Sequence, residues 1–80
     1  MNPEHLAEMA NDIANFFAAE PDRDIAVNAV SNHLKKFWDP RMRRQIVAYL
    51  RDHGGGELSE LARAGVARLG EIDAAQRPAA

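Results

Sequence analysis

The 80-residue sequence contains no cysteine and no threonine, and it has only two serines, Ser31 and Ser59. Without cysteine the chain can form neither a disulfide nor a thiolate zinc site, which are common ways to stabilise a domain with a small core. Nucleophilic catalysis needs an activated Ser, Thr, Cys or Lys beside a base. Because Ser59 is better explained as a helix cap and Ser31 as a polar residue on the solvent side of a helix, we expect no such catalysis.

Long apolar runs are also missing. No segment approaches the ~20 apolar residues of a membrane-spanning helix, and the N-terminus lacks the apolar stretch of a secretory signal. The three histidines, His5, His33 and His53, stand on different expected helices, so their spacing predicts no metal site. A chain of this length builds one small core and leaves little room for a catalytic cleft. We therefore expect a cytoplasmic protein that is not an enzyme by itself.

Helix signals recur along the chain. Asn2-Pro3, Asp22 and Asp39-Pro40 each combine a capping side chain with a suitable first turn, and Gly54-Gly55-Gly56 suits a helix end. No phosphate-loop pattern follows these glycines, which favours a cap and linker. Apolar residues at intervals of three and four predict helices over about residues 3–19, 23–38, 40–53 and 59–69. Their expected buried stripes are Leu6, Met9, Ala10, Ile13, Phe16 and Phe17; Ala26, Val27, Val30, Leu34, Phe37 and Trp38; Met42, Ile46, Tyr49 and Leu50; and Leu58, Leu61, Ala62, Gly65, Val66 and Leu69.

These signals predict an all-α fold. Short connections favour antiparallel neighbours, so we expect a small antiparallel bundle of three helices plus a short fourth C-terminal helix laid across it or onto a partner. Residues 1–70 then form a single helical domain. Residues 71–80, with Ile72 as their one bulky apolar side chain, are expected to be a flexible C-terminal tail.

Charge is segregated along the chain although the net charge is only −2. Residues 1–34 carry six carboxylates against one arginine, and residues 35–51 carry six cations against one carboxylate, which gives −5 and then +5. The segment 33–44 also holds two aromatic residues, Phe37 and Trp38. Three interpretations stay open: core aromatics with a solvated basic face, a nucleic-acid-binding surface, or a protein-docking surface rich in the residue types that dominate interfaces. The acidic first helix weakens the nucleic-acid interpretation.

Three stretches resemble a known family: residues 9–17, residues 27–34, and the run Lys-Phe-Trp-Asp-Pro-Arg-Met-Arg at 36–43 followed by His53-Gly54-Gly55. The sequence is similar there to the delta subunit of NAD-dependent, molybdenum-containing formate dehydrogenase, over about residues 6–69. The resemblance implies a non-catalytic accessory subunit of a cytoplasmic complex that supports assembly or stability of the catalytic alpha subunit. It also implies that the alpha subunit holds molybdopterin guanine dinucleotide and iron–sulfur clusters, and that beta and gamma subunits carry FMN, NAD and further clusters.

From the residues themselves we expect no catalytic, cofactor-binding or metal site in this chain. The resemblance implies contact with the alpha subunit, and through it the beta and gamma subunits. Because arginine and aromatic side chains concentrate interface energy, we expect that contact in the basic, aromatic segment. The partner-binding residues that we predict are Lys36, Phe37, Trp38, Arg41, Arg43 and Arg44. A transient maturation factor that assists molybdopterin cofactor insertion is the alternative, since arginines also bind phosphates. A small helical nucleic-acid-binding module is a weaker one.

Overall fold

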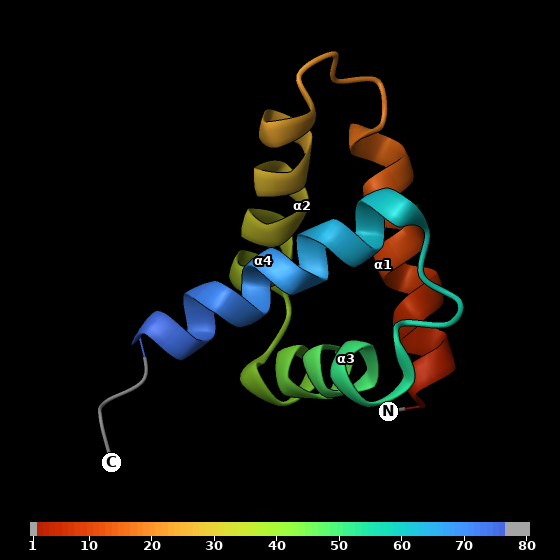
Figure 1. The fold of residues 1–80 in the computed structure, drawn as a ribbon, viewed down its shortest axis with the longest axis vertical. Coiled ribbons are helices and arrows are strands. Elements are labelled where there is room, and N and C mark those ends of the chain that lie inside the picture. Colours follow the sequence, from red (N-terminus) through yellow and green to blue (C-terminus); the bar gives the residue numbers. More distant parts are fainter. Residues whose placement is uncertain (1, 77–80) are drawn as a thin grey trace.

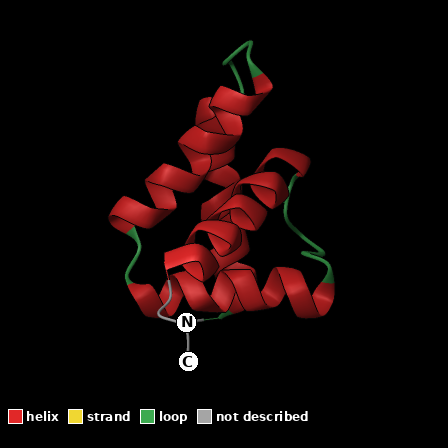
Figure 2. Ribbon diagram, turned by 60° about the vertical axis from the view of Figure 1, so that its left-hand side comes forward, coloured by secondary structure: helices red, strands yellow, loops and turns green. Residues whose placement is uncertain are grey.

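The computed structural model describes residues 2–76, which form four helices joined by short loops (Figure 1). α1 spans Pro3–Phe17, α2 spans Arg23–Phe37, α3 spans Pro40–His53 and α4 spans Glu60–Gln76. No strand occurs among these residues, as Figure 2 shows. The prediction of an all-α fold is therefore confirmed.

The helix ends lie where local side chains stabilise them. The side chains of Asn2, Asp22, Asp39 and Ser59 each accept a hydrogen bond from a backbone N–H two or three residues later, at 2.8, 3.2, 2.9 and 3.2 Å respectively. These N–H groups have no partner inside the helix, so each cap stabilises a first turn. Gly54 ends α3 with a φ of 66°, a conformation that glycine adopts without steric cost. The predicted caps are thus confirmed.

The arrangement of the helices differs in one respect from a simple antiparallel bundle. α1 and α2 form an antiparallel hairpin, but α3 lies across the open end of that hairpin (Figure 1). Trp38 and Asp39, the two residues that join α2 to α3, both have extended backbones, with ψ of 139° and 163°. Because Pro40 then restarts the helix at once, the chain turns a corner and does not reverse direction.

α4 is the longest helix, whereas the sequence predicts a short one that ends near Leu69. It runs for 17 residues to Gln76 and packs against all three other helices, most extensively against α2. Beyond Leu69, Gly70 lies against Val47 of α3 and Ile72 is half-buried, so packing stabilises the extra turns. The first six residues of the expected tail are therefore helical, and residues 77–80 lie outside the described part of the chain.

The core lies between the hairpin, α3 and α4. Its residues from α1 are mostly small, and its residues from the rest of the chain are mostly larger apolar ones. Its buried residues are Leu6, Ala7, Ala10, Ala14, Val30, Leu34, Trp38, Ile46, Leu58, Ala62, Val66 and Leu69.

The crossing of α2 and α4 depends on Gly65. A Cβ atom placed at Gly65 would lie 2.8 Å from the Cβ of Val30, too close for two carbon atoms. The glycine therefore lets the two helices touch directly. Ser31, which follows Val30, is fully buried at this crossing, although the apolar pattern of α2 places it on the solvent side. That prediction is wrong because α4 covers this side of α2.

Polar contacts fix the start of α4. The Asn11 side chain of α1 donates to the Glu57 carbonyl at 2.9 Å and accepts from the Ser59 N–H at 2.7 Å. On the other side, the Arg23 guanidinium at the start of α2 pairs with the Glu60 carboxylate at 2.5 Å. Both contacts join segments far apart in the sequence, and together they hold the first turn of α4 against the hairpin.

Candidate docking surface

The predicted partner-binding residues lie around the corner between α2 and α3, but they do not form one surface. Lys36 and Phe37, in the last turn of α2, are exposed, as are Arg41 and Arg44 on α3. The other two residues, Trp38 and Arg43, are turned into the protein.

Trp38 belongs to the core. Only 6% of its surface is exposed, and its backbone N–H donates to the Leu34 carbonyl at 3.0 Å, which caps α2. The neighbouring Phe37 is 70% exposed. Two adjacent aromatic residues thus have opposite roles: Trp38 packs inside the corner and stabilises it, and Phe37 is available for contact with another molecule.

Arg43 fastens α3 to α2. It is half-buried, and its Nη1 donates to the Lys35 carbonyl at 3.2 Å. That carbonyl lies in the last turn of α2, where backbone oxygens lack helical partners and carry partial negative charge. The contact therefore stabilises the corner from within, which is a structural role for this arginine.

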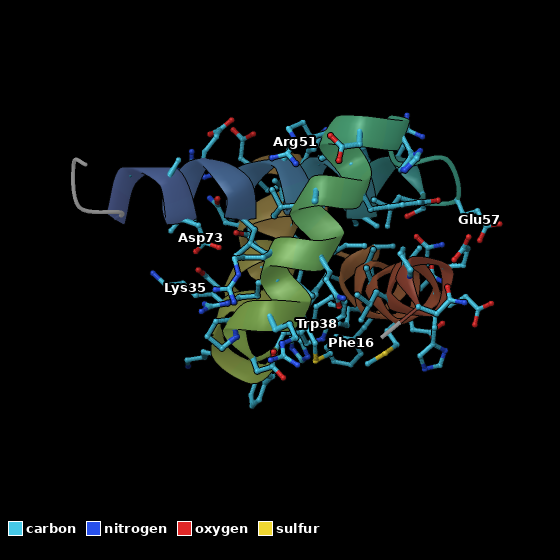
Figure 3. All side chains as sticks on the ribbon, turned by 90° about the horizontal axis from the view of Figure 1, so that it is seen from below. Phe16, Lys35, Trp38, Arg51, Glu57 and Asp73 are labelled. Atoms are coloured by element: carbon cyan, nitrogen blue, oxygen red, sulfur yellow. The ribbon has the colours of Figure 1, made fainter. Side chains whose placement is uncertain are left out.

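An exposed aromatic surface extends from Phe37 across the hairpin. Phe16 of α1 is 78% exposed and contacts Phe17 edge-on, with ring centroids 5.0 Å apart. Phe17 in turn lies 6.2 Å from the His33 ring, and His33 lies 4.7 Å from the Phe37 ring. Figure 3 shows Phe16 on the side of the hairpin that faces away from α4. We call these four residues, Phe16, Phe17, His33 and Phe37, the aromatic face.

The sequence pattern assigns Phe16 to the buried stripe of α1, and this prediction is wrong. The buried residues of α1 are Leu6, Ala7, Ala10 and Ala14. At about 100° per residue, Phe16 points roughly 135° away from the centre of that group. Steps of four and three residues connect Met9 to Ile13 and Ile13 to Phe16. Because a helix has 3.6 residues per turn, a series of such steps moves gradually around α1, away from the buried alanines. A helical-wheel projection centred on the buried alanines of α1 would have placed Phe16 on the exposed side.

Charged residues of opposite sign flank the aromatic face. Asp12 precedes Phe16 by one helical turn on α1, and Lys36 follows His33 by three residues on α2, so each is a neighbour on its helix surface. Both are exposed. Arg41, which is also exposed, stands in the first turn of α3 after the corner. The face therefore has an acidic end on α1 and a basic end where α2 meets α3.

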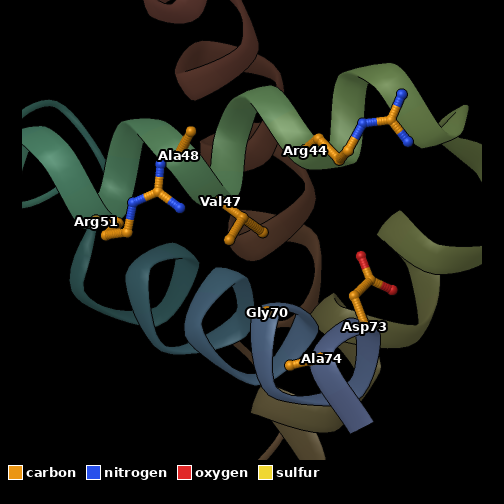
Figure 4. Close-up of a pocket in the computed structure, with 7 residues that line it drawn as sticks. All are labelled: Arg44, Val47, Ala48, Arg51, Gly70, Asp73 and Ala74. Carbon is orange, nitrogen blue, oxygen red and sulfur yellow. The ribbon is translucent and has the colours of Figure 1, made fainter. Parts of the chain in front are cut away.

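A groove of about 370 Å³ lies between α3 and α4 beside their contact. Figure 4 shows Arg44 and Asp73 at one end of it and Arg51 at the other, with Val47 and Gly70 between them. Two guanidinium groups at its rim suit an anionic ligand or an acidic side chain.

Arg51 has a local partner. Its guanidinium donates to the Asp52 carboxylate at 3.0 Å, and this hydrogen bond lowers the pKa of the Asp52 carboxyl and raises the pKa of Arg51. Both side chains are exposed, so the pair contributes little to the free energy of unfolding.

Within the described residues, no group of three or more histidine, aspartate or glutamate side chains is placed to hold a metal ion. None of the four helices combines the length and the apolar composition needed to cross a membrane.

Comparison with known proteins identifies the family. Residues 5–66, more than half of the chain, match the family of NADH-dependent formate dehydrogenase delta subunits, FdsD. Comparisons with curated proteins and with solved structures give no match. The matched segment contains nearly all of the hairpin, the corner with its tryptophan, α3 and the first part of α4, including Gly65. The chain therefore belongs to the family of delta subunits of NADH-dependent formate dehydrogenase.

Proposed function

We propose that this delta subunit is a non-catalytic accessory subunit that supports the assembly or stability of the catalytic alpha subunit in the cytoplasm. Its family membership carries the proposal, because it makes the other subunits of formate dehydrogenase the expected partners. The structure offers support of a second kind. Its side chains fill a small core, and the largely exposed Phe37 stands beside the exposed cation Lys36, an arrangement typical of an interaction surface.

The contact residues that we propose are Lys36, Phe37, Arg41 and Arg44. Phe37 supplies exposed apolar area, and the three cations supply the charge that orients a partner during encounter. Trp38 and Arg43 act indirectly, because they hold the corner on which the contact residues stand.

Co-purification tests this proposal. A tagged delta subunit is co-expressed with the alpha, beta and gamma subunits, and the amount of alpha subunit retained on the tag is measured. We expect retention with the wild-type chain and a clear loss with the double variant Lys36→Glu, Arg41→Glu. The matched control is Arg68→Glu, a charge reversal at an exposed position on α4 outside the corner. A wild-type chain that retains no other subunit contradicts the proposal.

A transient maturation factor that assists molybdopterin cofactor insertion is the second candidate, and the groove between α3 and α4 favours it. Arg44 and Arg51 line the groove rim, and guanidinium groups can bind phosphate, although Arg51 would first have to leave its Asp52 partner. Stoichiometry separates the two functions. One delta subunit per alpha subunit in the purified active enzyme supports the accessory subunit, whereas active enzyme that lacks the delta subunit supports the maturation factor.

A further inference from the structure

We propose that the whole aromatic face, and not the basic corner alone, is the surface by which this chain binds another subunit of the dehydrogenase. The inference rests on the proposed function and deepens it. Its occupant is an apolar patch of that subunit with a carboxylate opposite Lys36 and a cation opposite Asp12. Phe16 and Phe37 are the two anchors, although they belong to different helices.

The aromatic face carries two large side chains that are mostly exposed. Phe16 and Phe37 are 78% and 70% exposed, and a phenylalanine offers more apolar area than any aliphatic side chain. Single exposed apolar residues are common, but here ring contacts through Phe17 and His33 connect two of them into one surface. Contiguous aromatic surface of this kind is where interface energy concentrates.

The rings of the aromatic face are preorganised for binding. The four rings stand on two helices that pack against each other, and edge-on or tilted contacts at 5.0, 6.2 and 4.7 Å hold them in register. A partner that binds them immobilises few additional side chains. The entropy lost on binding is therefore smaller than for four independent surface residues.

The charge pattern indicates the chemistry of the occupant. Lys36, a helix neighbour of His33, attracts carboxylates, and Asp12, a helix neighbour of Phe16, attracts a cation. A uniformly acidic ligand such as nucleic acid satisfies only the basic end. The basic end is also continuous with the corner that the proposed function assigns to a dehydrogenase subunit, so a single partner covers both.

A second copy of this chain carries the same aromatic face with the same two charges. The experiment must therefore distinguish a second copy from a dehydrogenase subunit as the occupant. If a two-fold axis paired two such faces, Lys36 of each copy would meet Asp12 of the other. Single charge reversals would then break the pair, and the double reversal Asp12→Lys, Lys36→Glu would restore it. With a different subunit as the partner, the double reversal restores nothing.

The test uses the full chain co-expressed with the other dehydrogenase subunits. Phe16→Ser and Phe37→Ser are each expected to weaken retention of the partner subunit about tenfold or more, as removal of an interface anchor does. Ile25→Ser is the matched control, because Ile25 is 54% exposed on α2 but lies outside the face. Circular dichroism of each purified variant verifies that it folds. Covalent footprinting of the wild-type complex, in which we expect Phe16 and Phe37 to be protected, provides evidence that needs no variant.

The outcomes separate the two proposals. If the wild-type chain retains no dehydrogenase subunit, the proposed function itself fails. If the wild-type chain retains its partner and the Phe16 and Phe37 variants do so equally well, with both rings unprotected, only the present inference is overturned. If the isolated chain dimerises and the double charge reversal restores that dimer, the occupant is a second copy and the inference is likewise overturned.

Discussion

Replacement of Gly65 by alanine tests the closest contact in the fold. The new methyl group would lie 2.8 Å from the Cβ of Val30, where ordinary contacts are 3.4–4 Å, so α2 and α4 must move apart or shift. Overpacking of this kind costs about 1–3 kcal/mol, whereas alanine in a helix interior gains up to ~1 kcal/mol over glycine. We therefore expect a net destabilisation of about 1–2 kcal/mol, and each kcal/mol lowers the Tm of a domain this size by roughly 4–8 °C.

Urea unfolding followed by tryptophan fluorescence measures this effect, because Trp38 is the only tryptophan and is buried. Gly70→Ala is the matched control in the same helix. Its Cβ would lie 3.2 Å from the end of the half-buried Val47 side chain, which can move, so we expect a change within about 1 kcal/mol. The double variant Gly65→Ala, Val30→Ala should be destabilised by less than the sum of the two single variants. A Gly65→Ala chain as stable as the wild type would show that the helices do not touch here.

Three further substitutions test other parts of the fold. Asn11→Ala removes both side-chain hydrogen bonds to the loop before α4 and should destabilise the chain by about 1–3 kcal/mol in urea unfolding. Hydrogen exchange at the Ser59 N–H should become faster. Unchanged exchange there would contradict the role of this contact. Trp38→Ala removes a large core side chain and should cost about 3–5 kcal/mol, enough to abolish most helical circular dichroism at 37 °C; a folded variant with wild-type Tm would contradict a core role for Trp38. Gly54→Ala places a Cβ at a φ of 66° with no atom within 4 Å, so only backbone strain acts; thermal unfolding should show a loss of about 1 kcal/mol, and no loss would mean that the cap relaxes.

The sequence predicts the helices well because their ends depend on local interactions. Asn2, Asp22, Asp39 and Ser59 bond to N–H groups only two or three residues away, and such contacts can be recognised in a short window of sequence. The same is true of Gly54. The corner after Trp38 is also local, since the extended residue before a proline follows from sterics alone.

What depends on packing between helices is not visible in such a window. Ser31 is polar and is expected on the solvent side of α2, away from its apolar stripe, but α4 covers it. The extension of α4 to Gln76 depends on contact with α3. The sequence after Leu69 contains few bulky apolar residues from which these extra turns could be predicted. The sequence predicts part of the candidate surface, because Lys36 and Phe37 stand out beside a proline turn. Phe16 resembles a core residue in the sequence, and only its angular position around α1, relative to that of the buried alanines, shows that it is exposed. The contacts with a partner subunit stay predictions.

The position of α4 has a consequence for the order in which the protein forms during synthesis. α4, which packs against all three other helices, follows them in the chain and therefore leaves the ribosome after them. The hairpin and α3 therefore emerge with the apolar surface that α4 will cover still open to water, and a nascent chain in that state is prone to aggregation. The packing of these four helices is thus completed only after α4 has been synthesised, and a co-translational chaperone would meet the uncovered face of α2 before that.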